Sequence, residues 1–165
     1  MIFQFSQDER GAWSGHDVLM ALLDRRPHDA LNQPRDAISV VLLEHHDLMR
    51  RSLRGLLDSE DGIDVVCETP DLACAQRAVR AQKPQVLIID PHAETGLALS
   101  TVSELHRGEP NTPIVVIAME ASHFFAAGAF TAGAIGYVLK DHADTDLADA
   151  VRSAARGQQY VSPTI

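Results

Sequence analysis

The chain has 165 residues, 45% of them hydrophobic, and a formal net charge of −9 with an isoelectric point of about 5.2. The length suits one domain with residues to spare, and the acidic balance argues against a nucleic-acid-binding surface, which needs clustered Lys and Arg. No apolar run reaches the roughly 20 residues of a membrane span and the first residues lack a signal-peptide pattern, so we expect a cytoplasmic protein without membrane contact.

The pattern of the chain changes near residue 37. We predict an N-terminal arm over residues 1–37 and a domain over residues 38–165. Within the arm, a stretch over residues 17–23 places its leucines on one helical face, which favours one short helix. The arm carries no recognisable chemistry, and its apolar face favours docking on a neighbouring surface.

From residue 38 onward, apolar runs alternate with amphipathic stretches. ISVVLL at 38–43 has no polar alternation after Ser39, which is typical of a strand covered on both faces. The stretch 47–59 has leucines on one side and arginines on the other, which is typical of a helix. Further strands are predicted at 63–68, 85–90, 112–118 and 135–139, and further helices at 71–82, 97–107, 122–132 and 144–157. Alternation with short connections predicts an α/β fold, a doubly wound five-stranded parallel sheet in the order 2-1-3-4-5 with helices on both faces in three layers.

Polar residues follow several of these predicted strands. The first strand is followed by Glu44 and His45, the third ends at Asp90, and the fifth is followed by Lys140. Ligands of such sheets bind beyond the carboxyl ends of the strands, at the point where the strand order reverses. We therefore expect these residues to converge at one edge of the sheet and to form a site.

Four segments together resemble the receiver domains of NarL/LuxR-type response regulators. They are ISVVLLEHHDLMRRSLRGLLDSEDGIDVV, KPQVLIID, TAGAIGYVLKD and GQQYVSP. The resemblance implies a flavodoxin-like fold with Asp90 as the phosphoacceptor, Lys140 as the invariant lysine and Tyr137 as the switch aromatic. It also implies two-component signal transduction (a phosphorelay with a possible sensor kinase), a homodimer, and transcription regulation in which DNA is contacted only through an output domain absent from this chain.

The sequence departs from the family's pattern within the pocket itself. The usual acidic pair reads Glu44 and His45, the hydroxyl residue at the end of the fourth strand is Ala118, and the loop proline is replaced by Glu94. Glu44 and Asp90 still offer oxygen ligands, but an imidazole suits Zn, Cu or Ni better than Mg²⁺. We expect no cofactor, or Mg²⁺ bound weakly at best, and a pocket in which phosphorylation is impaired or absent.

Each candidate residue also has a plainer structural interpretation. Asp90 could cap the segment after its strand, and Lys140 could be an exposed lysine, although its position favours contact with the Asp90 carboxylate. We expect Asp47 to be the N-cap of the first domain helix rather than a third metal ligand. His46 is expected to pack or hydrogen-bond, because the histidine spacing fits no standard zinc pattern.

Three functions are compatible with such a fold. The first is an atypical receiver that forms the regulatory half of a LuxR-type transcription regulator. The second is a pseudo-receiver that binds a small molecule or a protein partner independently of phosphate. A hydrolase using Asp90 is disfavoured, because the chain has no nucleophile elbow, phosphate-binding glycine loop or catalytic triad. We therefore expect a signalling module and not an enzyme.

Overall fold

The computed structural model describes residues 37–91 and 98–165. The predicted arm helix and Glu94 lie outside these residues, so both expectations stay predictions. Within the described part, no helix is both long enough and apolar enough to cross a membrane.

The observed elements lie within a few residues of the predicted ones. The strands are β1 (Ile38–Leu43), β2 (Ile63–Thr69), β3 (Val86–Ile89), β4 (Ile114–Ala118), β5 (Gly136–Leu139) and β6 (Tyr160–Val161). The helices are α2 (Asp47–Asp58), α3 (Leu72–Gln82), α4 (Ala98–Gly108), α5 (His123–Thr131) and α6 (Ala143–Ala155), and a 3-10 turn η1 (Lys140–His142) joins β5 to α6.

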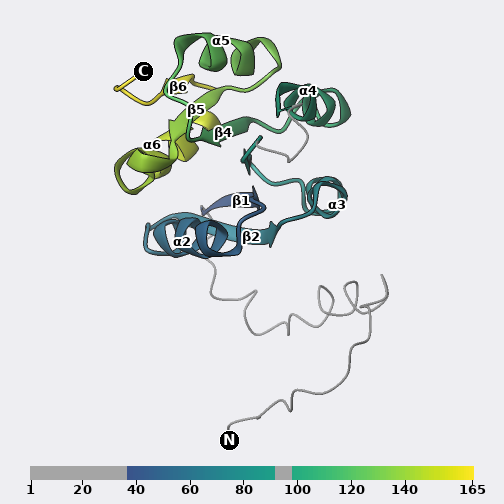
Figure 1. Cartoon of the computed structure of the whole chain (residues 1–165). Coiled ribbons are helices and arrows are strands. Elements are labelled where there is room, and N and C mark those ends of the chain that lie inside the picture. Colours follow the sequence, from purple (N-terminus) through teal and green to yellow (C-terminus); the bar gives the residue numbers. More distant parts are fainter. Residues whose placement is uncertain (1–36, 92–97) are drawn as a thin grey trace, which may run out of the picture. The chain divides into compact units, whose positions relative to one another are not determined.

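The strands form one parallel sheet in the order β2-β1-β3-β4-β5-β6 (Figure 1). The predicted order of the first five strands is confirmed, and the sixth strand was not predicted. It forms because Tyr160 N–H donates to the carbonyl of Ile135 at 3.1 Å and Ser162 N–H donates to that of Tyr137 at 2.9 Å. A pair of residues is too short for a strand pattern, and their pairing depends on α6 returning the chain to the edge of β5.

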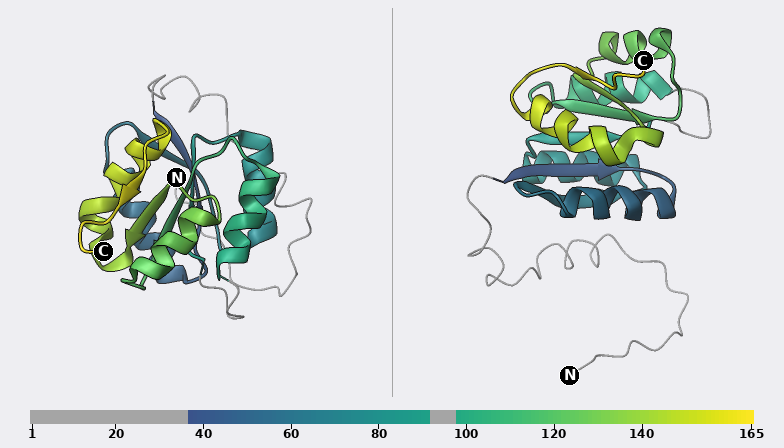
Figure 2. Two further views of the ribbon diagram at one scale, coloured as in Figure 1. Left: turned by 90° about the horizontal axis from the view of Figure 1, so that it is seen from above. Right: turned by 90° about the vertical axis from the view of Figure 1, so that its left-hand side faces the viewer.

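Helices cover both faces of the sheet and produce two apolar layers (Figures 1 and 2). On one face, α2 and α6 pack against alternate strand residues such as Leu42, Ile88 and Val138. On the other face, α3, α4 and α5 pack against Leu43 and Ile89. The central strands are buried on both faces, which explains their unbroken apolar runs.

The start of α2 differs from the prediction. His46, with extended backbone angles, is the N-cap and its side chain makes no capping hydrogen bond, so the assignment of Asp47 as N-cap is wrong. Asp47 is the first helical residue, and its Oδ1 lies 2.7 Å from Nη2 of Arg50. The negative charge of the Asp47 carboxylate in the first turn therefore interacts favourably with the positive end of the helix dipole. The pKa of Asp47 is lowered, chiefly by the hydrogen bond from Arg50.

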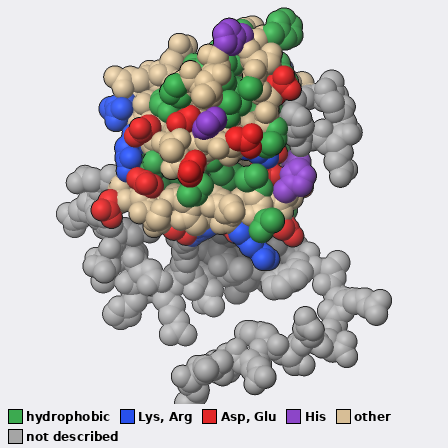
Figure 3. Space-filling model, turned by 60° about the vertical axis from the view of Figure 1, so that its left-hand side comes forward, with side chains coloured by type: hydrophobic (Ala, Val, Ile, Leu, Met, Phe, Trp, Pro, Cys, Tyr) green, Lys and Arg blue, Asp and Glu red, His purple; other side chains and the backbone are tan. Residues whose placement is uncertain are grey.

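Acidic side chains are distributed over the surface of the domain. On the face shown in Figure 3 they occur in several places, interrupted by histidines and by apolar patches. The acidic groups on this face agree with the formal net charge of −9.

Candidate functional site

Lys140 lies between two buried carboxylates at the carboxyl edge of the sheet. Its Nζ donates to Oε2 of Glu44 at 2.6 Å and to Oδ2 of Asp90 at 2.7 Å. The side chains of Glu44, Asp90 and Lys140 are 0%, 1% and 5% exposed. The contact of Lys140 with Asp90 is the one that the sequence predicts, while the equally short contact with Glu44 was not predicted.

The strand ladders hold the two acids side by side. The backbone N–H of Glu44 donates to the carbonyl of Thr69, and that of Asp90 donates to the carbonyl of Leu43. Both residues therefore continue the parallel pairing by one step beyond their strands. The side chain of Lys140, which follows β5 directly, reaches across the edge to both of them.

The C-terminal segment fixes the strand that carries Lys140. Ser162 is buried, its hydroxyl donates to Oδ2 of Asp146 at 2.5 Å, and it accepts a hydrogen bond from the backbone N–H of Leu139 at 3.1 Å. The residue before Lys140 is thus bonded to α6 through one serine. None of these polar contacts was predicted from the sequence, because each depends on the return of the chain after α6.

Burial and hydrogen bonding act in opposite directions on Glu44. Burial by itself raises the pKa of the Glu44 carboxyl, but the hydrogen bond from Lys140, the backbone N–H of His46 and the positive charge of Lys140 together lower it below its ordinary value of 4.5. Glu44 is therefore held as a carboxylate, although it is wholly buried.

His45 and His46 point to different partners. Nδ1 of His45 lies 2.7 Å from the carbonyl oxygen of Pro70, at the end of β2. A carbonyl only accepts, so His45 donates from Nδ1 and is committed to the loop before α3. Nδ1 of His46 lies 3.1 Å from Oε1 of Glu44. The sequence grouped His45 with the pocket, but among the described residues it is His46 that contacts a pocket acid.

Glu44, His46 and Asp90 are grouped closely enough to be considered as metal ligands. Each offers one ligand atom, and these atoms lie within 4.8 Å of one another. However, the ammonium group of Lys140 already contacts both carboxylates of this set. A cation at this position would have to displace the ammonium group or share its oxygens, which weakens the case for a metal.

Ala118 and Tyr137 lie beside the edge, within the apolar layer formed with α3, α4 and α5. Ala118, the last residue of β4, is fully buried and supplies no hydroxyl. The fully buried Tyr137 donates its hydroxyl to the carbonyl of Glu120 at 2.7 Å and meets the edge of the Phe125 ring. Burial raises the pKa of Tyr137 to about 12, and the negative charge of Glu120 adds to the effect. The tyrosine is held inward in this structure.

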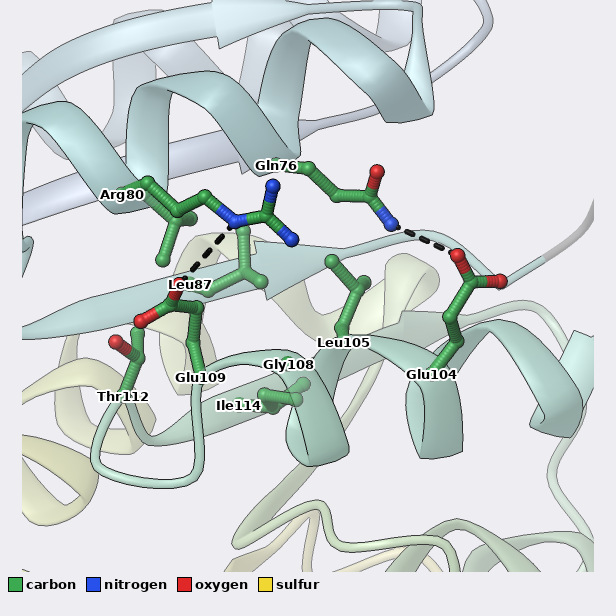
Figure 4. A pocket seen from close by; sticks show the side chains of 10 residues that line it. Gln76, Arg80, Leu87, Glu104, Leu105, Gly108, Glu109, Thr112 and Ile114 are labelled. Carbon is green, nitrogen blue, oxygen red and sulfur yellow. Dashed lines mark hydrogen bonds and ion pairs between the residues drawn. The ribbon is translucent and has the colours of Figure 1, made fainter.

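A hollow lies between α3 and α4, near the starts of β3 and β4 (Figure 4). It has a volume of about 200 Å³ and an apolar floor that includes Leu87. Polar pairs already close its rim: Gln76 bonds Glu104 at 2.9 Å, and Arg80 lies 3.3 Å from Glu109. None of the candidate site residues lines it, so we place the functional site at the opposite, carboxyl edge of the sheet.

The chain is similar in sequence to response regulators. The family model described as the response regulator receiver domain matches residues 40–152. The oxygen regulatory protein NreC of Staphylococcus carnosus is 30% identical over 129 residues, which cover 76% of this chain and 58% of NreC. The DNA-binding transcriptional activator DevR/DosR of Mycobacterium tuberculosis is 31% identical over 124 residues, or 75% of this chain and 57% of that protein. The chain thus spans less than two thirds of these relatives.

Solved structures share the fold. A LuxR-family two-component response regulator from Aurantimonas sp. superposes with a TM-score of 0.71 at 26% identity, covering 77% of this chain and 91% of that one. The receiver domain of the response regulator NarL from Mycobacterium tuberculosis has a TM-score of 0.68 at 25% identity, covering 74% and 99%. A structure of two RcsB dimers bound to two parallel DNAs has a TM-score of 0.68 at 22% identity, covering 78% and 65%, and shows the fold alone.

Proposed function

The chain belongs to the response regulator receiver domain family, and we propose that it is the regulatory half of a LuxR-type transcription regulator whose pocket is no longer a Mg²⁺-dependent phosphorylation switch. The observation that carries the proposal is the double contact of Lys140. One ammonium group contacts both remaining carboxylates of the pocket, Glu44 and Asp90, and offsets one of their two negative charges. In this pocket Asp90 occupies the phosphoacceptor position, but His45 and Ala118 stand where the reaction needs a carboxylate and a hydroxyl.

The residues present fit Mg²⁺ poorly. Mg²⁺ requires near-octahedral oxygen ligands and is usually held by one or two carboxylates plus phosphate and water. Here each carboxylate has an oxygen bonded to Lys140, and the remaining position of the acidic pair is His45, which is bonded to Pro70. Losing one carboxylate near a divalent cation costs about 1–4 kcal/mol at effective dielectric constants between those of water and a protein surface. Phosphoryl transfer assisted by Mg²⁺ is therefore not part of the function that we propose for this site.

The proposed loss of the switch also rests on Ala118 and Tyr137. A hydroxyl at the end of β4 would hold the phosphoryl group, and Ala118 has none. A ligand shifts an equilibrium only by its different affinity for the two states. Without that hydrogen bond, worth roughly 1.5–3 kcal/mol, the bias falls about ten- to a hundredfold. The side chain of Tyr137 is already buried, and its hydroxyl donates to the carbonyl of Glu120. Phosphorylation would therefore cause little further inward rotation of this side chain.

Partners follow from the family and from the charge of the domain. We propose a homodimer that acts through protein contacts and not by catalysis, located in the cytoplasm. RcsB is seen as dimers on DNA, and DevR/DosR is a DNA-binding activator. Since this domain is acidic, we propose that DNA is contacted by an output domain and not by the receiver. We propose that a sensor kinase binding this domain transfers no phosphoryl group to Asp90.

Incubation with acetyl phosphate and Mg²⁺, followed by intact mass spectrometry, tests the proposal. We expect no gain of a phosphoryl group by the natural chain. The double variant His45→Asp with Ala118→Thr restores the family's second carboxylate and its hydroxyl, and we expect it to be modified. The same variant with Asp90→Asn is the control that assigns the modification to Asp90.

Two outcomes would decide against the proposal. Stoichiometric modification of the natural chain that Asp90→Asn abolishes would show that Glu44 and Asp90 suffice. Equal modification of the natural chain and the double variant would show that His45 and Ala118 do not limit the reaction. An unmodified natural chain beside a modified double variant would support the proposed loss of the phosphorylation switch through His45 and Ala118.

A further inference from the structure

The hollow between α3 and α4 has an apolar floor beneath a polar rim (Figure 4). The residues of its floor belong to the core and are at most 4% exposed, namely Val79, Leu87, Leu105 and Ile114. Its volume of about 200 Å³ is larger than the roughly 150 Å³ of an apolar cavity that holds benzene. A concave apolar space with a few convergent polar groups is the usual form of a small-molecule site. The hollow therefore has room for an apolar body about the size of one aromatic ring.

Gly108, at the end of α4, keeps one side of the hollow free. It has no side chain, and an added Cβ would lie 3.9 Å from Nη2 of Arg80, which is an ordinary van der Waals distance. A longer side chain at this position would therefore occupy space beside the Arg80 guanidinium without straining the backbone. The position offers a way to fill the hollow in a domain that still folds.

Two carboxylates and one guanidinium stand at the rim. The guanidinium of Arg80 lies 3.3 Å from Oε1 of Glu109, so these two charges offset each other. Oε1 of Glu104 accepts a hydrogen bond from the neutral amide of Gln76 at 2.9 Å. Among the described residues, no Lys, Arg or His forms an ion pair with Glu104. The negative charge of Glu104 is thus uncompensated at the rim, and it favours a cationic ligand.

Thr112 supplies a second polar group of the hollow. It is 8% exposed, and its backbone N–H donates to the carbonyl of Glu109 at 3.1 Å. Its hydroxyl makes no hydrogen bond within the part of the chain that the structure describes. Figure 4 shows Thr112 and Glu104 on opposite sides of the hollow. Because a buried hydroxyl normally has a hydrogen-bond partner, a polar group of a ligand would gain by bonding it.

We propose that the hollow binds a small aromatic or branched-chain amine that carries a hydroxyl group at the end opposite its ammonium group. The ammonium group pairs with Glu104, the apolar body covers the floor, and the hydroxyl bonds Thr112. Glu104 accepts from Gln76 with Oε1, so Oε2 receives the ammonium group while the pair across the rim is kept. The inference goes beyond the proposed loss of the phosphorylation switch and uses no residue of that pocket, so either can fail without the other.

The small size and the exposed rim of the hollow limit the expected affinity. Glu104 is exposed, so an ion pair with it gains less than a buried one. For a ligand of about ten heavy atoms we expect a dissociation constant of about 0.1–1 mM. The ammonium group should improve the affinity about tenfold over a neutral hydroxyl, and the distal hydroxyl should improve it about three- to tenfold.

Tyramine is the probe, because it has an ammonium group and a hydroxyl at opposite ends of one aromatic ring. Its titration into the full chain, followed by NMR of the backbone amides, should give saturable shifts in α3, α4 and residues 109–114. Phenethylamine, which lacks the distal hydroxyl, should bind about three- to tenfold more weakly. Tyrosol, which has a hydroxyl in place of the ammonium group, should bind about tenfold more weakly.

Substitutions assign the contacts, and the dispersion of the NMR spectrum verifies that each variant is folded. Glu104→Gln removes the charge at an exposed position and should weaken tyramine about tenfold while leaving tyrosol unchanged. Thr112→Val replaces the hydroxyl by a methyl group and should abolish the preference for tyramine over phenethylamine. Gly108→Leu fills the hollow and should abolish the binding of both amines. Glu60→Gln is the matched control, because it makes the same chemical change at an acid that does not line the hollow, and it should have no effect.

The outcomes separate a specific site from a general attraction of amines to an acidic protein. No saturable shifts with tyramine up to about 10 mM, or tyrosol binding as tightly as tyramine, would overturn the proposal. Equal weakening by Glu104→Gln and Glu60→Gln, or binding retained by a folded Gly108→Leu, would place the amine elsewhere and overturn it too. A preference for tyramine that survives Thr112→Val would overturn the contact of the hydroxyl. Weakening by Glu104→Gln and Gly108→Leu, with Glu60→Gln unchanged, would support the site whatever the phosphorylation experiment gives.

Discussion

Replacing Lys140 by methionine should destabilise the domain strongly, and by an amount that depends on pH. The change removes the ammonium group from Glu44 and Asp90, whose side chains are 0% and 1% exposed. Removing one partner from a buried ion pair costs roughly 3–5 kcal/mol, because a charge is left buried without compensation. For a domain with about 5–15 kcal/mol of total stability, this is a large fraction.

The expected pH dependence follows from Glu44. In the natural chain its pKa is lowered below 4.5, so the ionised group contributes stability above pH 4.5 and loses it as the pH falls through the lowered pKa. In Lys140→Met the burial of Glu44 is no longer offset, so its pKa should rise above the ordinary value. The ionised Glu44 carboxylate then costs stability at pH 7, and its protonation relieves this cost by up to about 1.4 kcal/mol per pH unit.

Urea unfolding followed by circular dichroism measures both effects, with a chelator present so that no divalent cation replaces the ammonium group. With an m-value of about 1–3 kcal/mol per molar urea, we expect the midpoint to fall by more than about 1 M at pH 7. The difference from the natural chain should shrink as the pH falls toward about 5, because protonation of Glu44 in the variant relieves the cost of its buried charge.

Lys83→Met is the control for the loss of one positive charge. Lys83 and Lys140 are the only lysines in the sequence, and Lys83 is exposed at the C-cap of α3. Lys83 has a positive φ of 47°. Lysine and methionine both carry a Cβ, so the substitution does not change the backbone strain at this position. We expect a change of less than about 0.5 kcal/mol. A loss in Lys140→Met no larger than this, or equal at both pH values, would refute the reasoning.

Three further outcomes are expected. Beryllofluoride with Mg²⁺ should leave the dimer affinity of the natural chain unchanged and tighten it only when Ala118→Thr and His45→Asp are combined, as measured by sedimentation. A large tightening in the natural chain would contradict the loss of the switch. Tyr137→Phe should cost about 0.5–1.5 kcal/mol at neutral pH. Because the pKa of the Tyr137 phenol is raised from 10 to about 12 in the folded state, the natural chain should lose stability as the pH rises through this range. Tyr137→Phe should remove this pH-dependent loss. If the stability of the natural chain and of the variant falls equally between pH 10 and about 12, the reasoning is wrong. Ser162→Ala should cost about 1–3 kcal/mol in thermal or urea unfolding, because Asp146 and the N–H of Leu139 both lose their buried partner, and a neutral substitution would argue that water replaces the hydroxyl.

The local pattern of the sequence was sufficient for the order of the first five strands and for the convergence of Glu44, Asp90 and Lys140 at one edge of the sheet. Unbroken apolar runs require cover on both faces, and short connections between strands and helices leave few parallel topologies. Because parallel strands end at one edge, Glu44, Asp90 and Lys140 were expected to meet from their positions alone. This reasoning needs only periodicity and strand direction, both of which are local properties.

Side-chain partners, in contrast, were decided by the tertiary structure. His45 bonds the carbonyl of Pro70, 25 residues away, so its place next to Glu44 in the sequence did not place its ring in the pocket. Lys140 reaches Glu44 across 96 residues, and this second contact turns an expected Lys–Asp pair into a bridge between two acids. The rotamer of a polar side chain is selected by whichever donor or acceptor packing brings within about 3 Å, and no local pattern records that position.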